Sequence, residues 1–271
     1  MTNYSAQSLD SLKPELGTGD LVFFQGTARD SVLIRELTGG EWSHCAMIIR
    51  AELIDESRSG LLLFESSIVP GPDVQSSAEE AKAGVMLVDF DARMNSYASS
   101  GNYSAFAIRQ LRQAVADRLE LQQLRSFIEN PLIRQSSYPA EHAVAAEHFL
   151  ARELESESFT SRALGKIRRE LGSEIPDSLS DSQIRAMIGK TVESVRDGFD
   201  QPIRDKINHD HSSVSHYFCS ELVVDALMHA GVMALRNAAG YSPSDLSLDD
   251  DEQIAASYGG LIALPADLGR G

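Results

Sequence analysis

The sequence is poor in cysteine, in basic residues and in long hydrophobic runs. It contains only two cysteines, Cys45 and Cys219, so no disulfide framework is expected and a reducing, cytoplasmic setting is favoured. The longest apolar runs, such as 61–64, have the length of a strand and are far too short to span a bilayer. The N-terminus lacks a basic region followed by an apolar stretch, which predicts no secretory signal, while export without such a signal stays open.

The shortage of basic residues limits the ligands that we expect. Lys and Arg total 24 against 40 Asp and Glu, which gives a formal net charge of −16. A chain this acidic repels phosphate backbones and anionic membrane surfaces. The sequence therefore predicts no nucleic-acid partner and no stable membrane insertion. The oligomeric state stays open.

The order of the apolar segments predicts an α+β fold whose core comes from two separated pieces of the chain. Residues 1–108 are β-rich, because short apolar runs alternate there with Gly and Pro turns. The strands expected in this piece are 21–24, 42–49, 61–66 and 85–90. Residues 209–271 add a helix over 219–230, which Gly231 ends, and a last strand over 261–264.

Residues 109–208 are predicted to form a helical insertion or lid between the two pieces. Apolar residues recur there at helical spacing before Asn130-Pro131 interrupts the pattern, and the first are Leu111, Val115, Leu119 and Phe127. A lid, a substrate-specificity module and an oligomer interface all stay open as roles for this segment.

Cys219 stands where the apolar-periodic helix begins. A lone cysteine is most often a small buried hydrophobe. At a helix N-terminus, however, the partial positive charge and the unpaired N–H groups favour the thiolate over the thiol. The same N–H groups can stabilise an oxyanion. The position therefore indicates a nucleophile.

His44 is the candidate base for this nucleophile. It lies in the predicted strand 42–49, and a histidine buried in a strand needs partners for its ring nitrogens. Side chains alternate along a strand, so His44 and Cys45 point to opposite faces. If His44 faces the helix of Cys219, Cys45 is expected to face away from it. This argues against a Cys45–Cys219 disulfide and against Cys45 as the nucleophile.

Glu65 ends the apolar run 61–64 and allows two interpretations. If its strand lies beside that of His44, the carboxylate can accept the second imidazole N–H and hold the ring in the useful tautomer. Alternatively, the strand simply ends there and the carboxylate is solvated. The pattern alone does not separate these two possibilities.

Four motifs in order carry a resemblance to a known family. They are Gly19-Asp20-Leu21-Val22-Phe23-Phe24-Gln25, Trp42-Ser43-His44-Cys45-Ala46-Met47-Ile48, Phe64-Glu65 and Tyr217-Phe218-Cys219-Ser220-Glu221-Leu222-Val223. Together they resemble the YiiX-type amidases, which are circularly permuted papain-like relatives of the NlpC-type peptidases and are related to the lecithin:retinol acyltransferase group. The match covers about the first ninety residues and the last fifty-five.

The resemblance implies a permuted papain-like core, in which a small antiparallel sheet packs on the catalytic helix. It also implies a Cys–His–Glu triad at Cys219, His44 and Glu65, with Gln25 as a polar neighbour. Independently of the resemblance, the Tyr217 hydroxyl can donate near the oxyanion or simply pack. The chain departs from the family in carrying Cys45 after the histidine, where a small aliphatic residue is common.

Two polar clusters are weaker candidates for metal sites. His209, Asp210, His211 and His216 look like metal ligands but lack an ordered spacing, and a polar linker is expected there. The run 249–252 lacks the glycine of a calcium loop and is expected to cap a helix that starts near Glu252. We therefore expect no metal and no cofactor.

These features predict a cysteine hydrolase that cleaves an amide bond in a peptide, an isopeptide or a lipid amide through an acyl-enzyme. Two alternatives stay open. The same triad supports a lipid acyltransferase or thioesterase, and a protein with this fold can also act by binding a partner without catalysis.

Overall fold

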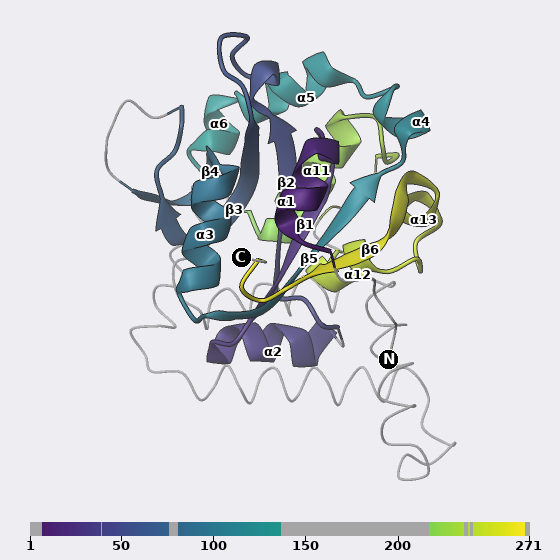
Figure 1. The fold of residues 1–271 in the computed structure, drawn as a ribbon. Helices are drawn as coiled ribbons and strands as arrows, with labels where there is room; N and C mark the ends of the chain where they lie inside the picture. Colours follow the sequence, from purple (N-terminus) through teal and green to yellow (C-terminus); the bar gives the residue numbers. More distant parts are fainter. Residues whose placement is uncertain are drawn as a thin grey trace, which may run out of the picture.

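The computed structural model describes residues 7–38, 40–75, 81–136, 217–235, 238 and 241–268. These residues form one six-stranded antiparallel sheet with helices on both faces, which confirms the predicted α+β class (Figure 1). The strands are β1 (Leu21–Gly26), β2 (His44–Arg50), β3 (Leu61–Gly71), β4 (Lys82–Asp89), β5 (Tyr103–Leu111) and β6 (Tyr258–Leu264). Their order across the sheet is β4-β3-β2-β1-β5-β6, so the last strand of the chain closes one edge.

Two layers of helices cover the sheet. The helices on one face are α1 (Leu9–Leu12), which 3-10 turn η1 (Lys13–Glu15) continues, and α3 (Phe90–Ser99). The elements on the other face are α4 (Gln113–Ala116), α5 (Leu121–Ile128), α6 (Pro131–Arg134), α11 (Cys219–His229), α12 (Pro243–Ser247), α13 (Glu252–Ser257) and 3-10 turn η2 (Ala51–Leu53). Helix α2 (Arg29–Thr38) lies beyond the end of the sheet (Figure 1).

Strand β2 shows why these strands are apolar throughout. Cys45, Met47 and Ile49 pack in the same apolar cluster as α11 and α5. Ala46 and Ile48 point the other way, into the cluster that includes α1 and α3. Because successive side chains alternate and both faces are covered, every residue from 44 to 49 is buried.

Helix α11 begins at Cys219 as predicted and ends in a glycine cap. Gly231 has φ 73°, its N–H donates to the carbonyl of Met228, and the N–H of Val232 donates to the carbonyl of Leu227. This pair of bonds is a Schellman cap, which requires the left-handed conformation that glycine adopts without strain. The predicted end of the helix is therefore confirmed.

The predicted helix through Leu111 and Phe127 is wrong. Residues 103–111 form strand β5 in the interior of the sheet, between β1 and β6, and two separate helices follow it. The helical spacing arose by chance from the end of a strand and two short helices. The predicted domain boundary between Ile108 and Arg109 thus falls inside β5, and α5 packs on α11. Residues 137–208 of the predicted insertion lie outside the described residues.

Helix α3 was not predicted, because Val85–Phe90 was assigned wholly to a strand. Strand β4 ends at Asp89, whose carboxylate accepts the N–H of Ala92 at 2.8 Å and so caps α3.

At the other end of the chain the predicted cap is confirmed, since Asp251 accepts from Gln253 and Ile254 at the start of α13. The last strand is also confirmed and begins earlier than expected, at Tyr258.

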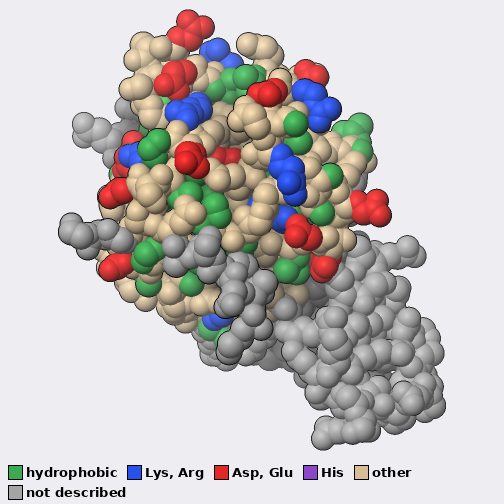
Figure 2. All heavy atoms as spheres, turned by 45° about the vertical axis from the view of Figure 1, so that its right-hand side comes forward, with side chains coloured by type: hydrophobic (Ala, Val, Ile, Leu, Met, Phe, Trp, Pro, Cys, Tyr) green, Lys and Arg blue, Asp and Glu red, His purple; other side chains and the backbone are tan. Residues whose placement is uncertain are grey.

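The surface mixes charges of both signs. On the face shown in Figure 2, acidic and basic side chains of the described residues are interspersed, and hydrophobic side chains lie among them singly or in small groups. Within the described residues, no helix is both long enough and apolar enough to cross a membrane.

Candidate active site

The site lies where the ladder between β2 and β3 opens. These strands pair from Met47–Arg50 against Leu61–Phe64, and the pairing stops before it reaches His44. Strand β3 meanwhile continues to pair with β4 through Ser67 and, after a shift in register, at Gly71. The chain leading into α11 docks beside this opening, where the Ser66 hydroxyl donates to the carbonyl of Tyr217 at 2.6 Å. The opening thus brings the start of α11 to the start of β2, where His44 lies.

Glu65 is the partner of His44. His44 Nε2 lies 2.9 Å from Glu65 Oε2, and the Glu65 side chain is fully buried. The alternative of a solvated carboxylate at the strand end is therefore wrong. Because Nε2 is occupied by Glu65, the ring presents Nδ1 to Cys219. A carboxylate in this position orients the imidazole and stabilises its protonated form.

Two residues of α3 hold Glu65 from the other side. Arg93 Nε donates to Glu65 Oε1 at 2.6 Å, and the Tyr97 hydroxyl donates to Oε2 at 3.0 Å. Burial acts to raise the pKa of Glu65, but the hydrogen bond with His44 and the charge of Arg93 outweigh it and hold the pKa below its usual value. Glu65 is therefore a carboxylate at neutral pH.

The guanidinium of Arg93 is itself fixed at several points. It donates to the carbonyls of Val69 at 2.6 Å and Pro70 at 3.0 Å and lies 4.4 Å from the ring centroid of Tyr97. The sequence interpretation missed this residue. A signal was present: Phe90, Arg93, Met94 and Tyr97 have the i, i+3, i+4, i+7 spacing of a buried helix face, and the arginine stands within it.

Cys219 is the first residue of α11 and is buried against β2. Hydrogen bonding from Cys45 is the largest influence on its pKa, and the charge and hydrogen bond of His44 act in the same direction. These effects overcome burial and hold the pKa of Cys219 well below the usual value for a cysteine.

His44 shifts in the complementary direction. Burial acts to lower its pKa, but the negative charge of Cys219 and the hydrogen bonds with Cys219 and Glu65 raise the pKa to about 9. Cys219 and His44 therefore form a thiolate–imidazolium pair at neutral pH. Such a pair can attack a carbonyl carbon and then supply a proton to the leaving group.

The expectation that Cys45 faces away from Cys219 is wrong. Strand alternation was assigned correctly, since His44 and Cys45 point to opposite faces. Helix α11, however, covers the face of Cys45, and Cys219 lies in the same apolar cluster as Cys45. Burial raises the pKa of Cys45 well above its usual value, and Cys219 raises it further, so Cys45 is a neutral thiol.

The two residues considered for the oxyanion differ in their surroundings. Gln25 lies near the end of β1, at the same end of the sheet as His44, and its Oε1 accepts from the Ser104 hydroxyl at 2.7 Å. The hydroxyl of Tyr217 instead donates to Asp225 Oδ2 at 2.9 Å, further along α11. This contact anchors the Tyr217 hydroxyl to α11, and a role of Tyr217 at the oxyanion stays a prediction.

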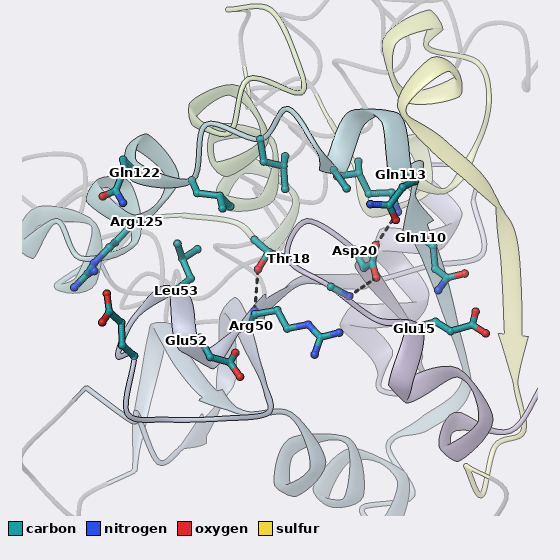
Figure 3. Close-up of a pocket in the computed structure, with 16 residues that line it drawn as sticks. Glu15, Thr18, Asp20, Arg50, Glu52, Leu53, Gln110, Gln113, Gln122 and Arg125 are labelled. Atoms are coloured by element: carbon teal, nitrogen blue, oxygen red, sulfur yellow. Dashed lines mark hydrogen bonds between the residues drawn. The ribbon is translucent and has the colours of Figure 1, made fainter.

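A hollow of about 900 Å³ lies at the opposite end of the sheet from His44 (Figure 3). Asp20, from the start of β1, and Arg50, from the end of β2, face it together with Gln110 of β5 (Figure 3). None of the residues of the Cys219 site lines it. This hollow is therefore separate from the candidate active site.

Asp20 in this hollow has a structural role. Its carboxylate accepts the backbone N–H of Leu111 at 2.7 Å and that of Gly17 at 2.8 Å. Burial outweighs these bonds and raises the pKa of Asp20 to about 6. The aspartate therefore links the turn before β1 to the end of β5. This contact gives the Gly19-Asp20 motif a structural role that does not involve catalysis.

Within the described residues, no three or more His, Cys, Asp or Glu side chains group in a way that could hold a metal ion. His209, Asp210, His211 and His216 lie outside the described residues, so the linker predicted there stays a prediction.

A scan against protein-family models found no match, and neither did a search of curated proteins. The resemblance based on the four motifs thus stays an expectation, and the chemistry has to be judged from the geometry of Cys219, His44 and Glu65.

Proposed function

We propose that this chain is a cysteine hydrolase on a circularly permuted papain-like core and that it cleaves an amide bond through an acyl-enzyme. The observation that carries the proposal is the electrostatic interaction between Cys219, at the positive end of a helix, and His44, which Glu65 holds at 2.9 Å from the other side. An ordinary buried cysteine needs neither partner. The order His44, Glu65, Cys219 along the chain fits a permuted arrangement.

In the proposed reaction the Cys219 thiolate attacks the carbonyl carbon of the substrate. The negative charge that develops on the carbonyl oxygen is stabilised by backbone N–H groups in the first turn of α11, with the amide of Gln25 as the second donor. His44 then gives its Nδ1 proton to the leaving amine. Water, activated by the neutral His44, hydrolyses the thioester and restores the pair.

The substrate in this proposal is a peptide, an isopeptide or a lipid amide. A lipid acyltransferase or thioesterase would differ only in the acceptor of the acyl group or in the bond that is cleaved, so product analysis separates these activities. The two cysteines are free thiols in the structure, and we propose a cytoplasmic location in keeping with that state.

Alkylation by iodoacetamide tests the activated pair directly. Mass spectrometry locates the label and gives its rate at each cysteine between pH 5 and pH 10 in the wild type and in His44→Ala, a range chosen to bracket about 8.5, the unperturbed value for a thiol. We expect Cys219 to react rapidly at the acid end of this range and to lose that behaviour without His44. Cys45 is an internal control, because its raised pKa predicts little labelling in the folded protein. Equal, slow labelling of Cys219 in both proteins would contradict the proposal.

Substitutions test turnover once a substrate is found. Cys219→Ala should abolish hydrolysis and leave the fold intact, as circular dichroism can verify. Glu65→Gln should lower the rate on the order of 100-fold and leave residual activity, because the imidazole loses its charged partner. Near-normal turnover by Cys219→Ala would exclude this mechanism.

A further inference from the structure

The side chain of Arg93 is buried behind the candidate active site, on the face of the sheet that α3 covers. Only 3% of this side chain is exposed, and its Nε donates to Glu65 Oε1 at 2.6 Å. Enclosing a guanidinium is costly unless it is paired. The proposed reaction assigns it no step, so its position calls for an explanation in terms of what it holds.

The two oxygens of the Glu65 carboxylate have different partners. Oε1 accepts from Arg93, whereas Oε2 lies 2.9 Å from His44 Nε2 and accepts from the Tyr97 hydroxyl at 3.0 Å. A carboxylate held at one oxygen cannot turn freely about its last bond. The contact with Arg93 therefore keeps Oε2 directed at the imidazole.

The end of β3 holds the guanidinium in turn. The register of β3 shifts after Ser67, and the carbonyls of Val69 and Pro70 in the shifted segment accept from Arg93 at 2.6 Å and 3.0 Å. The N–H of Val69 donates to the Ser67 hydroxyl oxygen at 3.1 Å. A planar, rigid guanidinium suits three acceptors at fixed positions, which the single ammonium group of a lysine cannot match.

The ionisable groups around Glu65 come from four elements besides its own strand. They are His44 of β2, Arg93 and Tyr97 of α3, Tyr103 of β5 and Cys219 of α11. Burial raises the pKa of both tyrosines, so they are neutral. In the part of the chain that the structure describes, His44 and Arg93 are thus the two cations that face Glu65. Without Arg93, the thiolate, the imidazolium and the carboxylate would leave one uncompensated negative charge.

We propose that Arg93 is a positioning residue for the hydrolysis, which acts through Glu65 to fix the ring of His44 and to offset the negative charge of the buried site. Its effect on catalysis rests on the proposed function, whereas its effect on Glu65 can be measured without a substrate. Loss of this cation favours uptake of a proton by Glu65 or Cys219. A proton on Glu65 weakens its hold on the imidazolium, and a proton on Cys219 removes the nucleophile.

A ¹³C NMR titration of the Glu65 carboxyl carbon tests the hold on Glu65 in the full-length chain. The signal is assigned by its absence from Glu65→Gln. In Arg93→Met we expect this carboxyl to titrate about 1–3 pH units higher than in the wild type. Arg93→Gln is the second neutral variant, in case the methionine prevents folding, and it keeps an N–H donor. Titration at the wild-type pH in the folded neutral variants would overturn the proposal.

Two further variants separate charge from general packing. Arg93→Lys keeps the positive charge, so its Glu65 carboxyl should titrate closer to the wild-type pH than that of either neutral variant. Arg125→Met removes a surface ion pair with Glu129 on α5 and should leave the titration as in the wild type. An Arg93→Lys titration as far displaced as that of Arg93→Met would contradict the charge effect.

Steady-state kinetics on a substrate of the wild type test the effect on catalysis. In the neutral variants kcat should fall on the order of 10-fold to 100-fold, because the imidazole is less well placed. KM should stay unchanged, since the buried guanidinium does not reach the substrate. The acid limb of the pH profile should move to higher pH and should be largely restored in Arg93→Lys. A purely structural arginine would move neither kcat nor this limb in the folded protein.

The two measurements separate failure of this inference from failure of the proposed function. A wild type that hydrolyses its substrate, with kcat and the acid limb unchanged in the neutral variants, contradicts the positioning role alone. A displaced Glu65 titration in a protein that has no hydrolase activity and whose Cys219 alkylates slowly contradicts the hydrolase and still supports the hold of Arg93 on Glu65.

Discussion

Four buried side chains at the candidate site form a series in space, in which each charge lies next to a charge of opposite sign. The Cys219 thiolate meets the His44 imidazolium, which meets the Glu65 carboxylate, which meets the Arg93 guanidinium. A buried charge without a partner is costly, and a chain of opposite charges offsets that cost. Each member therefore depends on its neighbour for its charge state.

The first prediction at this scale is a pH profile for hydrolysis with its alkaline limb near 9. As the pH rises through about 9, His44 loses the proton that it gives to the leaving group in the proposed reaction, so the rate should fall. On the acid side the rate should persist to well below the usual pKa of a cysteine, because Cys219 stays a thiolate there. Steady-state rates across the pH range measure both limbs.

Glu65→Gln should move that alkaline limb to lower pH, because the hydrogen bond and charge of Glu65 help to raise the pKa of His44. Glu129→Gln, on the exposed ion pair of α5 with Arg125, is the matched control and should leave the profile unchanged. An alkaline limb that stays in place in Glu65→Gln would show that the two groups are not coupled.

The second prediction concerns Arg93. Arg93→Met leaves Glu65 buried with one charged partner fewer, and we expect a loss of about 3 kcal/mol in the free energy of unfolding. Urea denaturation measures it. Arg125→Met, which removes an exposed ion pair 3.2 Å from Glu129, should cost less than about 1 kcal/mol. Similar losses in the two variants would mean that Arg93 contributes no more than a surface pair.

At the scale of elements, the Schellman cap at Gly231 ends helix α11. The third prediction is that Gly231→Ala destabilises the protein by about 1 kcal/mol, since a residue with a Cβ is strained at φ 73°. The added Cβ would also lie 3.0 Å from the side chain of Glu120. Thermal unfolding measures the change.

Gly17→Ala is the control for this substitution. No heavy atom lies within 4 Å of a Cβ built at Gly17, and its backbone is not left-handed. Its effect should stay within about 0.5 kcal/mol. If Gly231→Ala were equally mild, the Schellman cap would not be what ends α11.

The secondary elements were predicted well where the signal was local and poorly where it was not. The start of α11, its glycine cap and the Asp251 cap of α13 each depend on a few adjacent residues, and all three are found. Strand β5 was missed because it is interior to the sheet, and its apolar residues satisfy a helical spacing as well as an extended one.

At the scale of the molecule, Arg109 joins β5 to the C-terminal part of the chain. Its buried guanidinium donates to the carbonyls of Leu246 at 3.0 Å, Leu248 at 2.7 Å and Gly259 at 2.9 Å, and it also pairs with Asp249. These contacts hold α12 and β6 against a strand that precedes them by well over a hundred residues.

The fourth prediction is that Arg109→Met lowers the free energy of unfolding by about 3 kcal/mol, because it leaves buried carbonyls without donors. Urea denaturation followed by fluorescence measures the loss. Arg118→Met is the matched control, since Arg118 is exposed and its guanidinium donates to the carbonyl of Ala114 within its own segment of the chain, and it should cost less than about 1 kcal/mol. Equal losses of unfolding free energy in the two variants would show that Arg109 does not stabilise the packing of the C-terminal part of the chain against β5.

The sequence by itself determined the fold class and the start and end of helix α11, and it singled out Cys219 and His44 as candidates, while it left two interpretations open for Glu65. Periodicity, capping and residue type are properties of near neighbours, so they can be read along the chain. Only the tertiary structure decided which face of β2 the helix covers, and hence that Cys45 lies in the same cluster as Cys219 and that Arg93 holds Glu65. Such contacts join segments far apart in the sequence, and they follow from packing and from the opening between β2 and β3, which no local pattern specifies.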